Sequence, residues 1–155
     1  MKGGGHPWYP PFMALTIAQL LKEAESSMKS DPKRAVEALS SAFDLAKAAG
    51  VNDDTSVVAE VLARGWAWRK SPARSLHFAT LATKLSPEQK STWATLAKTC
   101  ELIATRTDEK KKKRRAVALY KGAASAFKKA ASLTKDPEDK RWLLELAGDA
   151  SRQAK

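Results

Sequence analysis

The strongest chemical signal in the sequence is a run of six consecutive cations that could bind anions. Its members are Lys110, Lys111, Lys112, Lys113, Arg114 and Arg115. No apolar residue occurs from Asp108 to Arg115, so we expect the run to form the solvated start of a helix over about 109–134 and to project past the core. Three interpretations are open: a solvated helix end, a contact with RNA or DNA phosphates, and a nuclear-import or acidic-protein contact.

Side chains that could carry out catalysis are few and stand apart from one another. The two histidines, His6 and His77, show no HExxH spacing, and the sequence contains no glycine-rich phosphate loop. Cys100 is the only cysteine, which excludes an intramolecular disulfide and argues against a cysteine-based metal site. We expect a buried structural thiol, because no base that could activate Cys100 is evident. The sequence therefore predicts a protein without enzymatic activity, bound metal or cofactor.

The composition indicates one helical domain with an acidic partner. With 155 residues, 43% of them hydrophobic, the chain can build one core. Strand-forming residues are sparse and no segment alternates polar and apolar residues, which predicts an all-α fold. The formal net charge of +11 favours an acidic protein or peptide, RNA or DNA, or an anionic membrane surface as the partner.

Apolar runs in the sequence are short. None approaches the ~20 residues of a membrane-spanning helix, and the N-terminus lacks the apolar core of a signal peptide. We therefore expect a soluble intracellular protein, in the cytoplasm or the nucleus. The sequence does not indicate an oligomeric state.

Four sites place a capping side chain directly before a proline, a pairing that suits the first turn of a helix. They are Asp31-Pro32, Ser71-Pro72, Ser86-Pro87 and Asp136-Pro137. Thr16 and Gln19 have the form of a capping box, and Thr55 is a further candidate cap. Gly50 is typical of a left-handed helix end. These signals predict seven helices, over about 16–30, 32–49, 56–69, 72–85, 87–106, 109–134 and 137–153.

The first 15 residues differ in composition from the rest of the chain. They combine glycines, prolines and aromatic residues, and the glycines and prolines disfavour a helix. We expect 1–15 to be a flexible tail and 16–155 to be a single helical-repeat domain. The alternative for the tail is an arm whose aromatic residues dock on the body or on a partner.

Three predicted helices begin with the same pattern of a cation, a small residue and an apolar residue. The pattern occurs at Arg34-Ala35-Val36, Arg74-Ser75-Leu76 and Arg115-Ala116-Val117, about 40 residues apart. Small residues follow on the same helical face, so a partner helix can pack closely. A repeat of this length is typical of stacked two-helix hairpins. We therefore predict a right-handed α-hairpin solenoid of three hairpins plus a C-terminal capping helix, in which Trp142, Leu143 and Leu146 close the open end.

A set of small, large and proline positions recurs from residue 59 onward. The set is Ala59, Leu62, Ala63, Trp66, Ser75, Ala79, Ala82 and Pro87, and its first four positions recur as Trp93, Leu96, Ala97 and Cys100. This spacing resembles the tetratricopeptide-repeat family, over about 16–130 and most strongly over 59–100. A rival resemblance, to the three-helix microtubule-interacting-and-trafficking domain, covers about 91–153. It rests on Leu96-Ala97-Lys98, 116–120 and 136–138. Both resemblances imply a helix-hairpin scaffold that binds other proteins.

The tetratricopeptide resemblance implies a groove bordered by Arg64, Trp68 and Lys98. Arg64 and Lys98 hold equivalent positions on successive first helices, one repeat apart. Trp66 lies in register with the packing residues of its hairpin, whereas Trp68 points to the nearly opposite side. Two cations beside an aromatic residue could hold an acidic peptide or a terminal carboxylate. The asparagines of the similar family clamp are absent at matching positions, so we expect a generally acidic ligand; packing of Trp68 between hairpins is the alternative.

Overall fold

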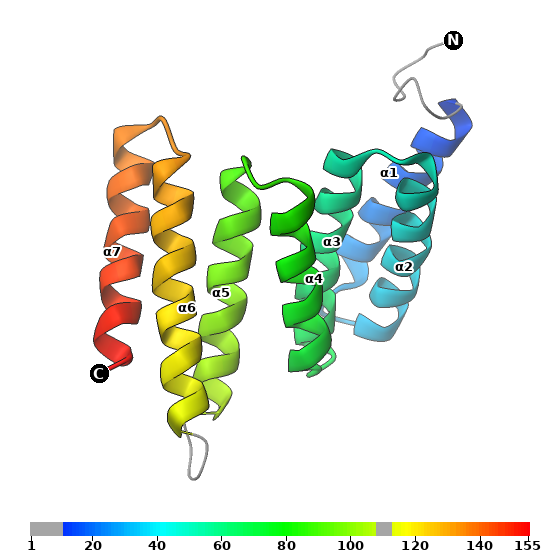
Figure 1. Cartoon of the computed structure of the whole chain (residues 1–155). Helices are drawn as coiled ribbons and strands as arrows, with labels where there is room; N and C mark the ends of the chain where they lie inside the picture. The colour runs from blue at the N-terminus through cyan, green and yellow to red at the C-terminus, as the bar shows by residue number, and fades with distance from the viewer. Residues whose placement is uncertain (1–10, 108–112) are drawn as a thin grey trace. The chain divides into compact units, whose positions relative to one another are not determined.

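The computed structural model describes residues 11–107 and 113–155, which contain seven α-helices and no strand (Figure 1). The helices are α1 (Pro11–Ser27), α2 (Pro32–Ala49), α3 (Asn52–Trp68), α4 (Pro72–Leu85), α5 (Lys90–Thr107), α6 (Lys113–Ser132) and α7 (Pro137–Gln153). In the ranges described, no helix combines the length and the apolar composition that crossing a membrane requires. The predicted all-α class is confirmed.

The helices group into two compact units, Met1–Leu85 and Ser86–Lys155. In the first unit α1 packs on α2, α2 on α3 and α3 on α4. In the second unit α5 packs on α6 and α6 on α7. The most extensive packing in each unit thus joins helices that follow one another in the chain, and the single domain over 16–155 stays a prediction.

Three helices begin where the sequence predicts them, and side-chain capping is seen at α2 and α7. α2, α4 and α7 each start at the proline of a predicted junction. The Asp31 carboxylate accepts a hydrogen bond from the Arg34 backbone N–H at 3.2 Å, and Asp136 accepts one from the Glu138 N–H at 3.0 Å. Gly50 ends α2 in the left-handed conformation, with φ 74°. These boundaries are confirmed because the groups that determine them are close neighbours in the chain.

α5 begins at Lys90 and not at the predicted Ser86-Pro87 junction. The Trp93 indole N–H donates a hydrogen bond to the Pro87 carbonyl at 2.8 Å, and the Thr92 hydroxyl donates one to the Ser86 carbonyl at 3.0 Å. A helix starting at Pro87 would use such carbonyls for backbone amides four residues further on. The prediction is wrong because side chains of α5 bind these carbonyls and hold the preceding residues in a turn.

α1 also begins at another residue than predicted. α1 runs from Pro11 to Ser27, so 11–15 are helical and do not belong to a tail. A proline fits the first helical turn because its missing N–H needs no partner there. α6 begins at Lys113, and the predicted helical start at 109–112 lies outside the described residues.

The start of α3 shows why Thr55 is not its cap. The helix begins at Asn52, three residues before Thr55. The Thr55 hydroxyl donates a hydrogen bond to the Val51 carbonyl at 2.7 Å, as threonines inside a helix often do. The predicted cap is wrong because its hydroxyl bonds backwards along the helix.

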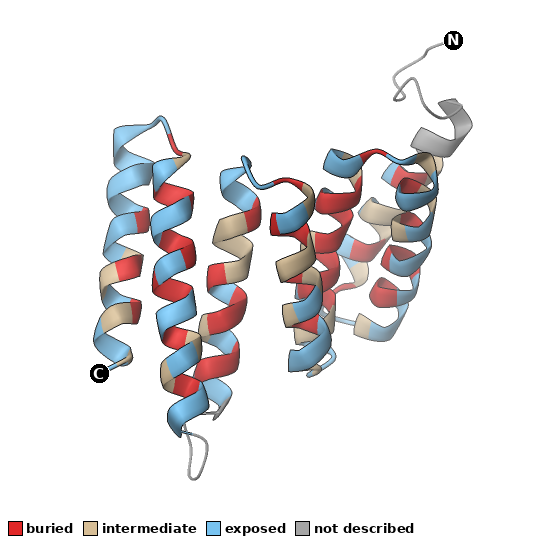
Figure 2. Ribbon diagram, viewed as in Figure 1, coloured by how far each residue is buried: buried red, intermediate tan, exposed pale blue. Residues whose placement is uncertain are grey.

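Small residues bring the helices close together in both units. The predicted faces of α2, α4 and α6 are buried at Ala35, Leu39, Ala42, Ser75, Ala79, Ala82, Ala116, Tyr120 and Ala123, and Figure 2 shows buried positions along these helices. The Ser75 hydroxyl donates a hydrogen bond to the Ala63 carbonyl at 2.7 Å, which ties α4 to α3. At Gly65 of α3, a Cβ atom would lie 3.0 Å from Val36 Cγ2 of α2. The three repeated faces therefore pack as predicted.

α7 covers α6 through a narrow face. Leu143, Ala147 and Ala150 are buried, and Phe127 is a fully buried side chain of α6. Trp142, which we expected to close the open end, is 59% exposed. That expectation is wrong because successive residues of a helix point about 100° apart, so Trp142 lies beside the packed face and not on it.

Replacing Leu143 by alanine tests how much α7 contributes to the second unit. Leu143 is 8% exposed, whereas its neighbour Leu144 is 47% exposed. We expect L143A to lower the free energy of unfolding by about 2–3 kcal/mol, because a buried leucine loses its transfer free energy and leaves a cavity. L144A is the matched control and should change it by less than about 0.5 kcal/mol. Urea titration followed by circular dichroism measures both; equal losses would contradict this packing.

Candidate functional site

A hollow of about 290 Å³ lies in the first unit between the end of α1 and the last turns of α3. Its lining residues are Glu25, Ser26, Met28, Lys29, Arg64 and Trp68. Arg64 and Trp68, two of the three residues predicted to border a groove, thus line the same hollow. They are four positions apart on α3, which places them on one face of that helix.

The turn after α1 supplies the other wall of the hollow. The Ser27 hydroxyl donates a hydrogen bond to the Glu23 carbonyl at 2.8 Å in the last turn of α1. Met28 follows with a buried side chain, and its sulfur lies 3.6 Å from the place where a Cβ atom on Gly65 would be. Gly65 therefore lets the turn approach α3 beside Arg64.

Exposed charge and exposed aromatic surface meet in this hollow. Arg64 Nη2 lies 4.0 Å from Glu25 Oε2, and the two side chains are 59% and 60% exposed. The Trp68 side chain is 49% exposed, and Lys29 is also exposed. An anion can reach the guanidinium and an apolar group can pack on the indole at the same time.

Trp66 has a different environment from Trp68, as the sequence predicts. It is half-buried and packs against the core of the first unit. The guanidinium carbons of Arg69 and Arg74 lie 5.3 Å and 4.6 Å from its ring centroid. Trp66 is therefore a packing residue, and Trp68 is the aromatic side chain that a ligand can contact.

Sequence reasoning missed the residues that α1 contributes to the hollow. The predicted helix over 16–30 would have kept Met28 and Lys29 in regular helix, whereas α1 ends at Ser27. No position of the recurring set marks Glu25 either, because that set begins at Ala59. Contact between α1 and α3 follows from the tertiary packing of the first unit.

Lys98, the third predicted groove residue, belongs to the second unit. It is exposed on α5. Partial burial raises the pKa of the neighbouring Glu101 carboxyl, and the positive charge of Lys98 lowers it again in part. A groove shared by Arg64 and Lys98 stays a prediction.

The described part of the basic run is exposed to solvent. Lys113, Arg114 and Arg115 are exposed in the first turn of α6, which contains no acidic residue. Arg106 is exposed in the last turn of α5. The remaining members of the run, Lys110, Lys111 and Lys112, lie outside the described residues.

The C-terminal end of α7 lies near the start of α6. Ala154 packs against the buried cluster of Ala104, Ala116 and Tyr120. Arg152 near this end forms an ion pair with Asp149. Cations from three helices thus gather at one end of the second unit, where several phosphates could be bound together.

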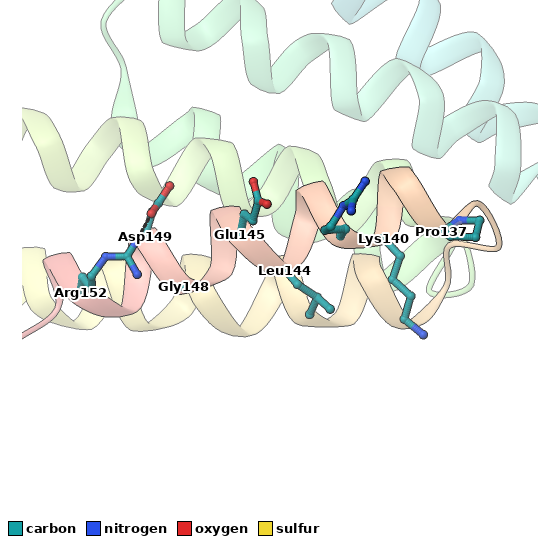
Figure 3. A pocket seen from close by; sticks show the side chains of 8 residues that line it. Pro137, Lys140, Leu144, Glu145, Gly148, Asp149 and Arg152 are labelled. Carbon is teal, nitrogen blue, oxygen red and sulfur yellow. Dashed lines mark hydrogen bonds and ion pairs between the residues drawn. The ribbon is translucent and has the colours of Figure 1, made fainter.

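A second hollow, of about 730 Å³, lies on α7 (Figure 3). Its lining residues are Pro137, Lys140, Arg141, Leu144, Glu145, Gly148, Asp149 and Arg152. All of them belong to one helix, so no second element closes the hollow and a ligand would stay open to water. A binding pocket normally surrounds most of its ligand, so the hollow between α1 and α3 is the better candidate.

Cys100 is buried between α5 and α6, as predicted. Its sulfur lies 3.8 Å from the place where a Cβ atom on Gly122 would be. Burial, and to a smaller extent the charge of Glu101, raise the pKa of the thiol to about 11. Among the described residues, no group of three or more histidine, cysteine or acidic side chains is arranged to hold a metal ion.

Comparison with known proteins identifies the fold. No protein-family model matches the sequence, and no curated protein matches it significantly. Among solved structures, the Sgt2 TPR domain from Aspergillus fumigatus is similar, with a TM-score of 0.65 and 19% sequence identity over 97% of this chain and 87% of that chain. The chain has a tetratricopeptide-repeat-like fold.

The tetratricopeptide-repeat-like fold confirms the predicted class, an all-α repeat of helical hairpins. It agrees with the spacing of the small and large positions that begins at Ala59. The rival resemblance over 91–153 stays a prediction; this range falls within the second unit and its three helices.

In this tetratricopeptide-repeat-like fold, the buried Cys100 should react slowly with alkylating reagents. Only the thiolate reacts, and a pKa of about 11 leaves roughly one thiol in a thousand ionised at pH 8. We expect iodoacetamide to label the folded protein at least about 100-fold more slowly than the urea-unfolded chain at this pH. Cys100 is the only cysteine, so the labelled mass reports this thiol alone. Similar rates in the two states would show that Cys100 is accessible.

Proposed function

We propose that this protein is a non-catalytic interaction scaffold that binds an acidic peptide or protein segment in the hollow between α1 and α3. The observation that supports the proposal is the accessible Arg64 guanidinium beside the half-exposed Trp68 indole. A ligand carboxylate would bind Arg64, and an apolar side chain next to it would pack on Trp68. The fold supports this reading by analogy, since helical-hairpin repeats commonly serve as binding surfaces.

Charge supplies both affinity and selectivity for such a ligand. A hydrogen bond to a charged group contributes about 1.5–3 kcal/mol, more than a neutral one. The formal charge of +11 attracts an acidic segment over a distance and repels basic competitors. Trp68 then discriminates among acidic segments, because an aromatic wall favours those that also carry an apolar group.

Arg64→Gln tests the proposed contact. The probe is a fluorescent peptide of aspartates and glutamates around one leucine, and fluorescence anisotropy at low salt gives its Kd. We expect R64Q to raise this Kd about tenfold, because a charge-assisted hydrogen bond of about 1.5 kcal/mol is lost. Trp68→Ala should weaken the same peptide but not a variant with alanine in place of the leucine.

Arg69→Gln is the matched control for this experiment. It removes the same charge from the same end of α3, but Arg69 lies over Trp66 and does not line the hollow. We expect its effect to be less than about twofold, as for a distant surface charge. Equal losses for R64Q and R69Q would reject the hollow as the binding site.

The alternative function is contact with RNA or DNA through the basic end of the second unit. The observation that favours it is the exposure of Lys113, Arg114 and Arg115 in a helical turn without an acidic residue. These side chains can engage phosphates in several orientations. Such contacts give affinity without sequence readout, which requires defined contacts to the bases.

Salt dependence tests this alternative. The triple variant Lys113→Gln, Arg114→Gln, Arg115→Gln should flatten the slope of log affinity against log salt for a mixed-sequence RNA by about 2–3, because each lost phosphate contact contributes roughly 0.7–0.9. The control triple Lys128→Gln, Lys135→Gln, Lys140→Gln removes equal charge elsewhere in the unit and should change the slope by less than about 1. RNA binding weaker than millimolar at low salt would exclude the alternative.

A further inference from the structure

We infer that Glu25 competes with the ligand of this hollow for the charge of Arg64, so that segments with two or more neighbouring carboxylates are favoured over segments with one. The inference rests on the proposed function of the same site and adds a regulating residue to it. It starts from the position of Glu25, which lines the hollow together with Arg64 and Lys29. In the free protein its carboxylate lies where a ligand carboxylate would approach Arg64.

The contact between Glu25 and Arg64 is loose. Its 4.0 Å between Oε2 and Nη2 is too long for a hydrogen bond, and both side chains are more than half exposed. A close ion pair between α1 and α2 provides the contrast: two nitrogens of Arg34 donate to Glu23 Oε1 at 2.7 Å and 2.9 Å. Glu25 therefore partly neutralises Arg64 without occupying its donors.

This arrangement makes a single ligand carboxylate a poor binder. Such a ligand meets a guanidinium whose charge Glu25 already neutralises in part, and its carboxylate must also approach the negative charge of Glu25. A second carboxylate on the ligand strengthens binding, because Lys29 lies in the same hollow and is exposed. A ligand with two carboxylates can then bind Arg64 and Lys29 together, while Glu25 turns towards solvent.

The magnitude of the effect follows from the exposure of the pair. Exposed ion pairs change equilibria by about two- to fivefold, and the effect falls as salt screens the charges. Glu25 thus favours ligands with several carboxylates over ligands with one. It would weaken binding of singly charged segments more than that of multiply charged ones.

The experiment compares Glu25→Gln with Glu23→Gln, two substitutions that remove the same charge two residues apart on α1. The probes are two fluorescent peptides around one leucine, the first with a single aspartate and the second with three neighbouring aspartates. We expect E25Q to tighten the single-aspartate peptide about two- to fivefold at low salt and the three-aspartate peptide by less than about twofold. E23Q should leave both Kd values within about twofold of the wild-type protein.

The outcomes separate the inference from the function on which it rests. Equal tightening by E25Q and E23Q would overturn the inference, since it would report only the net charge. No change with E25Q, while Arg64→Gln still weakens the three-aspartate peptide, would overturn the inference and leave the binding site intact. No effect of Arg64→Gln would reject the proposed function itself. Circular dichroism melts of each variant exclude a change in folding as the cause.

Discussion

Close approach between helices is the physical constraint on which the rest of this structure depends. Alanine is the most frequent buried residue in the described part of the chain, and the faces of α2, α4 and α6 contribute small side chains at helical spacing. A small side chain buries little area, so stability has to come from many close contacts between backbones and side chains. The helices come close together at Gly65, where even a methyl group would crowd Val36 of the neighbouring helix. Larger residues on these faces would separate the helices.

The candidate site is a consequence of the same constraint. Met28 reaches the core beside Gly65, and this contact draws the turn after α1 towards α3. Arg64 and Trp68 lie on either side of Gly65 in the chain, so the turn meets a cation and an aromatic ring where it approaches the helix. A bulkier residue at 65 would therefore alter the binding surface as well as the core. The chemistry of the hollow and the packing below it are not independent.

The sequence predicts those features whose causes are local. α2, α4 and α7 begin where a capping side chain precedes a proline, and the three small faces follow from helical periodicity alone. The start of α5 escapes prediction because the Trp93 and Thr92 side chains bind carbonyls that a helix would otherwise use. Trp142 is misassigned because periodicity identifies an apolar face but does not say which of two adjacent apolar residues is covered.

The site is predictable in part for the same reason. Arg64 and Trp68 are marked by their register on one helix, so the sequence alone could name them. Glu25 and Lys29 join them only through the packing of α1 against the rest of the first unit, and no spacing in the chain records that contact. Contacts between helices that are not neighbours in a repeat thus cannot be predicted from the periodicity of the sequence. They are also the interactions that shape the hollow.

The nearest-neighbour pattern of helix packing has a consequence for how this chain folds. Because the extensive contacts join successive helices, little chain entropy is lost before a hairpin gains stabilising contacts. Each hairpin can then serve as a nucleus to which the adjacent helix adds. Folding of this kind is rapid, and the free energy of local opening varies along the chain. Within each unit, a terminal helix packs extensively on one other helix, whereas an inner helix packs on two. We therefore expect the amides of the terminal helices to exchange with solvent first.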